Sequence, residues 1–152
     1  MSRVQLALNV DDVDEAVAFY STLFGTGPAK RRPGYANFAI DEPALKLVLI
    51  ENPGHGGSLN HLGVEVDSTD VVVDETRRLS AAGLTTAVQG GTTCCYALQD
   101  KVWIEDPDGN AWEVFVVKGE AAVMEKQTSA QGCCVPKISD DKPVKAGSGC
   151  CG

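Results

Sequence analysis

Residues 61–67, HLGVEVD, decide the fold, because they repeat the pattern of residues 5–11, QLALNVD, at an offset of 56 residues. Both stretches alternate apolar and polar side chains in the manner of a half-buried strand. Each leads into an amphipathic helix with an acidic start. The two stretches therefore mark the same position in two copies of one structural unit.

The remaining elements of each copy follow the same order. After the first strand we expect, in copy one, a helix over 13–24 and strands over 28–32, 35–40 and 45–50, and in copy two, a helix over about 70–82 and strands over 84–88, 96–105 and 111–117. The predicted fold class is α+β, with two βαβββ modules. Module one covers 1–51, a glycine-rich linker covers 52–58, and module two covers 59–118.

Beyond the second module the apolar periodicity stops, and Gly, Ser, Lys, Asp and Pro dominate. We expect residues 119–152 to form a disordered, cysteine-containing tail. The net charge of -8 and the pI near 4.6 disfavour nucleic acid and anionic membranes as partners, because both are polyanions. Without a signal-peptide pattern or a long apolar run, a cytoplasmic protein with a small-molecule ligand is expected.

The six cysteines form three adjacent pairs, Cys94-Cys95, Cys133-Cys134 and Cys150-Cys151. Neighbouring residues on a regular strand point to opposite faces, so Cys94 and Cys95 must lie in a loop or bulge to grip one atom. Gly90-Gly91 supplies the backbone freedom for that. Such a pair suits a soft centre such as trivalent arsenic, cadmium, zinc or cuprous copper; the alternative is two small buried hydrophobic residues. The tail pairs either scavenge metalloids or simply stay reduced.

A metal site is predicted from Gln5, His61 and Glu113. The first two occupy equivalent positions on the first strand of each module, and Glu113 lies on the last strand of module two. An amide, an imidazole and a carboxylate resemble the two-histidine, one-carboxylate set of non-haem iron oxygenases. A carboxylate in so apolar a strand also needs a partner. Alternatively, these are ordinary strand residues and a hydrogen-bonded histidine. Aligning 45–50 with 111–116 makes Leu47 the counterpart of Glu113, so no fourth ligand is expected.

The repeat, with these three residues in register, resembles the vicinal oxygen chelate superfamily, which includes glyoxalase I and the extradiol dioxygenases. The resemblance covers residues 3–118. Within it, the stretches 60–65, 92–96 and 99–103 are similar to organoarsenical carbon-arsenic lyases and to cadmium-induced proteins of actinobacteria.

This resemblance implies a curved mixed sheet and an enzyme that depends on Fe(II) and O2. It would cleave the carbon-arsenic bond of methylarsenite and trivalent aromatic arsenicals and release arsenite. Cys94 and Cys95 would bind the arsenic, and Gln5, His61 and Glu113 would bind the iron. Two alternatives stay open: another glyoxalase or dioxygenase of the same fold, and a non-catalytic thiol protein that binds cadmium or arsenite. Both monomer and homodimer are compatible with paired modules.

Overall fold

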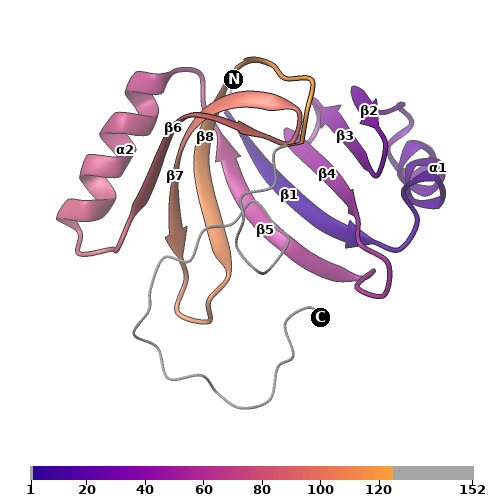
Figure 1. Cartoon of the computed structure of the whole chain (residues 1–152), viewed down its shortest axis with the longest axis horizontal. Helices are drawn as coiled ribbons and strands as arrows, with labels where there is room; N and C mark the ends of the chain where they lie inside the picture. The colour runs from indigo at the N-terminus through magenta and orange to yellow at the C-terminus, as the bar shows by residue number, and fades with distance from the viewer. Residues whose placement is uncertain (1, 125–152) are drawn as a thin grey trace. The chain divides into compact units, whose positions relative to one another are not determined.

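The computed structural model of the protein describes residues 2–124. The chain divides into two compact units, one ending at Val66 and the other beginning at Asp67. Each unit combines a β-sheet with one helix (Figure 1), which confirms the α+β class. Neither helix in the described part of the chain is long and apolar enough to cross a membrane. The predictions for 125–152, including both tail cysteine pairs, lie outside the described residues.

The first unit contains one helix and a mixed sheet. Its elements are β1 (Arg3–Val10), α1 (Val13–Phe24), β2 (Lys30–Arg32), β3 (Tyr35–Ile40), β4 (Leu45–Glu51) and β5 (Ser58–Glu65). The strands follow the order β2-β3-β4-β1-β5. β1 runs parallel to β4 and antiparallel to β5. The repeat assigns β5 to module two, but its hydrogen bonds to β1 place it in the first compact unit.

Helix α1 has the boundaries that its end signals predict. The Asp12 side chain accepts hydrogen bonds from two backbone amides of the first turn, and Gly25 ends the helix with a φ of 65°. Its apolar stripe packs on β3 and β4. Leu23 lies at the margin of the stripe and is 59% exposed.

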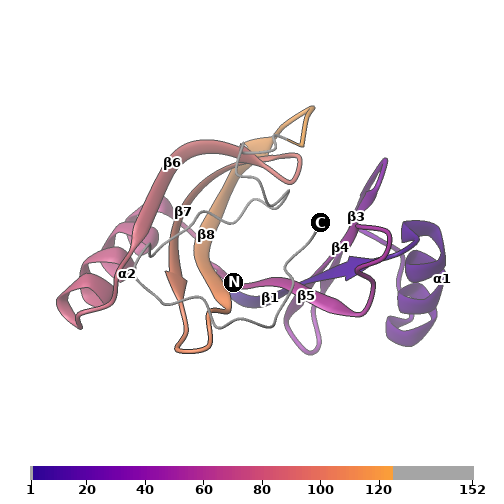
Figure 2. The ribbon, with the colours of Figure 1, turned by 60° about the horizontal axis from the view of Figure 1, so that its bottom comes forward.

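The second unit contains one helix and three antiparallel strands in the order β8-β7-β6. Its elements are α2 (Thr69–Ala81), β6 (Ala87–Cys94), β7 (Ala97–Glu105) and β8 (Ala111–Glu120). Figure 2 shows these three strands arching along their length. The strand expected over 84–88 instead begins at Ala87 and continues to Cys94, so the first thiol belongs to a strand rather than to a loop. β8 runs to Glu120, two residues past the expected module boundary.

Two β-bulges flank the middle of β7. In β6 the register shifts between Gln89 and Thr92, and Gly91 takes a φ of 58°, a conformation that glycine adopts readily. In β8 the register shifts next to Lys118. Asp100 of β7 accepts hydrogen bonds from the Gly91 backbone amide at 2.7 Å and from the Thr69 hydroxyl at 2.6 Å, and it pairs with Lys118 at 3.0 Å. We call these four residues the Asp100 cluster. It ties the start of α2 to both bulges.

Candidate metal and thiol site

Gln5 and His61 lie together on neighbouring strands of the first unit. In the β1–β5 register Ala7 is opposite His61 and Gln5 is opposite Gly63, so the two side chains are diagonal neighbours on one face. Both are buried, at 3% and 2% exposure, and Gln5 Nε2 lies 3.1 Å from His61 Nε2. The structure therefore brings together two of the three predicted metal ligands.

A bulge beside His61 fixes the state of its ring. The register shift between Ala7 and Leu8 leaves Asn60 as an extra residue, and its Oδ1 lies 2.7 Å from His61 Nδ1. Asn60 Nδ2 donates to Asn9 Oδ1 at 3.0 Å, so the oxygen of the Asn60 amide is the atom that faces the ring. An acceptor at that place keeps the proton on Nδ1 and leaves the lone pair on Nε2, the arrangement common in metal-binding histidines.

The thiols of Cys94 and Cys95 meet at a tight turn in the second unit. Cys94 pairs with Ala97 across the β6–β7 hairpin, so the connection has only two residues, Cys95 and Tyr96, with φ values of 54° and 59°. Two successive positive φ values are what a type I′ hairpin turn requires. The Sγ atoms lie 3.3 Å apart, which is hydrogen-bond distance for two thiols and too long for a disulfide. We call residues 94–97 the thiol turn.

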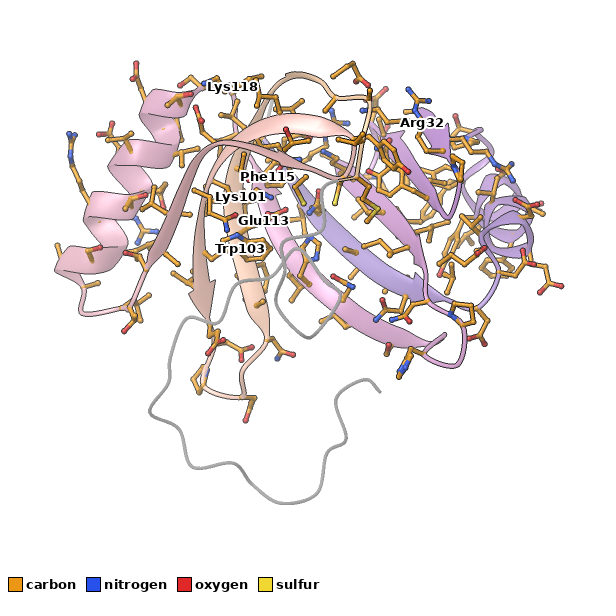
Figure 3. All side chains as sticks on the ribbon, viewed as in Figure 1. Arg32, Lys101, Trp103, Glu113, Phe115 and Lys118 are labelled. Carbon is orange, nitrogen blue, oxygen red and sulfur yellow. The ribbon has the colours of Figure 1, made fainter. Side chains whose placement is uncertain are left out.

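Glu113 of β8 is paired with a buried lysine. Lys101 Nζ lies 2.7 Å from Glu113 Oε2, and the two residues are 1% and 2% exposed. The lysine ammonium also lies 5.1 Å from the centre of the Trp103 ring, within cation-π range. Figure 3 shows these three residues gathered with Phe115 on the β7–β8 pair.

The charges around Lys101 keep it protonated. Burial by itself lowers the pKa of Lys101, but the negative charge of Glu113 and then those of the two cysteines outweigh burial. The pKa therefore lies above its ordinary value. Lys101 is thus a buried cation in contact with the Glu113 carboxylate, and it also interacts electrostatically with the two cysteines.

The residues present suit a divalent metal in their donor chemistry. His61 has its outer nitrogen occupied by Asn60, and rotating the amide of Gln5 by half a turn would set its oxygen beside His61 Nε2. Glu113 is held ionised by Lys101. Gln5 and His61 belong to one compact unit and Glu113 to the other, so the convergence of all three remains a prediction.

Leu47, which the sequence alignment sets against Glu113, faces the core of the first unit. It pairs with Leu6 and belongs to the apolar core beneath α1, whereas Gln5 pairs with Lys46 on the other face. Leu47 therefore faces away from Gln5 and offers no ligand. Lys46, on the Gln5 face, is an ammonium group that pairs with Glu65, and an ammonium cannot ligate a metal.

Sequence reasoning missed Lys101 as the partner of Glu113. The signal was present in the turn at 106–110, because Glu105 opposite Ala111 sets Lys101 opposite Phe115. Glu113 is then the diagonal neighbour of Lys101 on the same face. Deriving the β7–β8 register from that turn would have predicted the ion pair between Lys101 and Glu113.

A family profile described as the Glyoxalase/Bleomycin resistance protein/Dioxygenase superfamily matches residues 3–114. The chain belongs to this superfamily. This member is 54% identical over 152 residues to a Thermomonospora curvata protein named trivalent organoarsenical cleaving enzyme, covering 99% of this chain and 100% of the relative. It is 63% identical over 121 residues to the cadmium-induced protein CadI of Mycobacterium tuberculosis, covering 80% of each chain. The resemblance expected from the sequence is confirmed.

Solved structures of the superfamily share the fold at low identity. An extradiol ring-cleaving dioxygenase from B. fuscum matches with a TM-score of 0.59 and 20% identity over 78% of this chain and 33% of its own. A Mn(II)-bound glyoxalase from Novosphingobium aromaticivorans matches with a TM-score of 0.58 and 21% identity over 84% of this chain and 44% of its own. These likenesses confirm the vicinal oxygen chelate fold.

Proposed function

We propose that this chain cleaves the carbon-arsenic bond of trivalent organoarsenicals, such as methylarsenite and trivalent aromatic arsenicals, and releases arsenite in a reaction that needs Fe(II) and O2. The observation that carries the proposal is the thiol turn, where the sulfurs of Cys94 and Cys95 are 3.3 Å apart and form no disulfide. A relative that is 54% identical over 152 residues is named trivalent organoarsenical cleaving enzyme, which supports the cleavage reaction.

Substrate capture follows from the chemistry of two adjacent thiols. In a trivalent arsenical, RAs(OH)2, each thiol forms one sulfur-arsenic bond and its proton leaves with a displaced hydroxyl as water. Two waters are released, and arsenic keeps a single bond to carbon. Because both sulfurs belong to the thiol turn, the arsenic is fixed in position, and well-oriented reactants gain roughly 7 to 11 kcal/mol over free ones.

Lys101 prepares this site electrostatically. Its positive charge interacts favourably with negative charge at the thiol turn, and a thiolate attacks arsenic more readily than a thiol. It also stabilises the ionised form of Glu113, because burying a carboxylate without a positively charged partner is unfavourable. One cation therefore serves both the substrate ligands and a proposed metal ligand.

The metal would be held by Gln5, His61 and Glu113. Iron bound there would supply the activation of dioxygen that carbon-arsenic scission requires. The protein contributes a fixed His61 tautomer through Asn60 and an ionised carboxylate through Lys101. A neutral amide, an imidazole and a carboxylate are close in kind to the ligand set of non-haem iron oxygenases, which supports the assignment.

Arsenic speciation tests the function directly. Protein purified without oxygen and loaded with ferrous iron is mixed with methylarsenite and then exposed to air. We expect arsenite to appear only with both iron and oxygen present. Omitting either one and repeating the reaction with a metal-free protein are the controls. Methylarsenite that stays intact under all conditions would overturn the proposal.

A second candidate is sequestration of cadmium or arsenite without turnover. The observation that favours it is the 63% identity to proteins named cadmium-induced. The two functions differ in whether they need Gln5 and His61 of the first unit. Sequestration by the thiol turn would be unaffected by Gln5→Ala or His61→Ala, whereas lyase activity would be lost in both.

A further inference from the structure

Gln99 is a buried side chain whose chemistry the proposed reaction does not use. It lies on β7, opposite Thr92 of β6 and Val117 of β8, and is 4% exposed. By strand alternation it shares a face with Lys101 and with Trp103, the face that carries the Lys101–Glu113 pair. Its place on the hairpin is directly beside the thiol turn.

The orientation of the Gln99 amide is determined by the thiol turn. Its Nε2 donates to the backbone oxygen of Cys94 at 3.3 Å. Exchanging nitrogen and oxygen would set two acceptors against each other, so the oxygen must point elsewhere. Within residues 2–124, Gln99 Oε1 is the buried side-chain polar atom that has no hydrogen-bond partner.

An unpaired buried acceptor lowers the stability of the fold, and native proteins rarely keep one without a reason. Here the acceptor is tied to the residue that would bind arsenic. A ligand that brings its own N–H or O–H group into this place would remove the penalty. The orphaned oxygen therefore indicates a polar contact with whatever the thiols hold.

The arsenic atom itself cannot supply that donor. Once both thiols have displaced their hydroxyls, RAs has no O–H group left, and the remaining donors lie on the organic group R. Methyl and unsubstituted phenyl groups carry none. Amino- and hydroxyphenyl groups do.

We propose that Oε1 of Gln99 is a specificity-determining acceptor that binds an N–H or O–H group on the organic part of a trivalent arsenical held by Cys94 and Cys95. The inference rests on the proposed function and deepens it: among the arsenicals that the two thiols capture, those with an N–H or O–H group on an aromatic ring bind most tightly. Removing the acceptor abolishes the preference and leaves capture by sulfur intact.

The test measures binding without turnover. Iron-free protein is titrated under anaerobic conditions with phenylarsenite and with its 2-, 3- and 4-amino derivatives, and dissociation constants are read from tryptophan fluorescence. We expect at least one amino derivative to bind about tenfold more tightly than phenylarsenite, the effect of one satisfied hydrogen bond. In Gln99→Met that ratio falls to about one.

A matched control is Gln89→Met. Gln89 is another glutamine of the same hairpin, opposite Lys101, but its Oε1 already accepts from the Trp103 ring nitrogen at 3.1 Å. We expect the amino-to-phenyl ratio to stay at the wild-type value in this variant. Because the readout is a ratio, a general weakening of the thiol turn cancels.

The outcomes separate the two proposals. If the wild-type protein binds phenylarsenite and all three amino derivatives equally, or if the ratio persists in Gln99→Met, the role of Gln99 is overturned while capture by the thiols stands. If the wild-type protein binds none of them, the proposed function fails and the inference fails with it.

Discussion

The two units present different chemistry on the same kind of framework. In the first unit the site-bearing face holds the neutral Gln5–His61 pair, supported by amide side chains. In the second it holds an ammonium, a carboxylate and two thiols. Neutral groups can be buried with hydrogen bonds alone, whereas a buried carboxylate needs a counter-ion. The comparison explains why Glu113 needs Lys101 as a counter-ion, whereas Gln5 and His61 are buried without one.

Removing one thiol of the second unit should have the largest effect on organoarsenical turnover. We expect Cys94→Ser and Cys95→Ser to lower organoarsenical turnover on the order of 100-fold or more, because a single sulfur no longer fixes the arsenic. Iron content, measured by elemental analysis, should be unchanged. The double variant Cys133→Ser/Cys134→Ser is the control and should turn over normally. Full activity in either single variant would remove the thiol turn from the mechanism.

Breaking the buried ion pair should produce the largest loss of stability. Glu113→Ala leaves the Lys101 charge without its main partner, and we expect the free energy of unfolding to fall by about 3 to 5 kcal/mol, together with loss of iron. Chemical denaturation and metal analysis measure the two effects.

The double variant Lys101→Met/Glu113→Leu separates these effects. It removes both charges, so stability should recover most of the lost free energy while iron binding stays lost. A double variant as unstable as the single one would show that the pair is held by packing rather than charge.

Releasing His61 should have a moderate effect confined to the first unit. We expect Asn60→Ala to weaken iron binding about 10- to 100-fold, the usual effect of losing an outer hydrogen bond to a ligating histidine. Competition with a metal chelator measures it. Binding of phenylarsenite to the iron-free protein should not change. An unchanged iron affinity would show that the bulge does not orient the ring.

The Asp100 cluster should give a small, pH-dependent effect. Hydrogen bonds from Thr69 and then from the Gly91 amide, with the charge of Lys118, lower the pKa of Asp100 below its ordinary value of 3.8. Its stabilising contribution is therefore complete above the unfolded-state pKa and is lost as pH falls through the lower folded-state pKa. We expect Asp100→Asn to reduce the free energy of unfolding by about 1 to 2 kcal/mol at pH 7. The difference from wild type should shrink at acid pH; a constant difference would contradict this assignment.

Local signals predicted the framework well. The 56-residue repeat located both copies of the unit, and the helix expected over 13–24 has those bounds in the structure, where Asp12 and Gly25 cap it. Hydrophobic periodicity and helix-capping residues depend only on residues that are close in sequence, so both can be recognised without the structure.

Pairing between strands was harder to predict. Strand register and bulges determine which residue pairs with Glu113, which face of the sheet carries Leu47, and why Gln99 Oε1 has no hydrogen-bond partner. A register shift of one residue moves every side chain of a strand to the opposite face. The thiol pair was found because its two residues are adjacent in sequence. Its position at the tip of a two-residue hairpin depends on Gly91 and the β6 bulge, which set the register.

The positive φ values of Cys95 and Tyr96 also bear on how such a protein responds to selection. Asn-Gly is the pair that a type I′ turn prefers, and each unsuitable residue there costs on the order of 1 kcal/mol or more. Selection for heat resistance alone would therefore favour Cys95→Asn with Tyr96→Gly. That change would delete one thiol. Thermostability and thiol chemistry therefore favour different residues at these two positions. Laboratory evolution for thermostability alone should yield a more stable protein that has lost its activity.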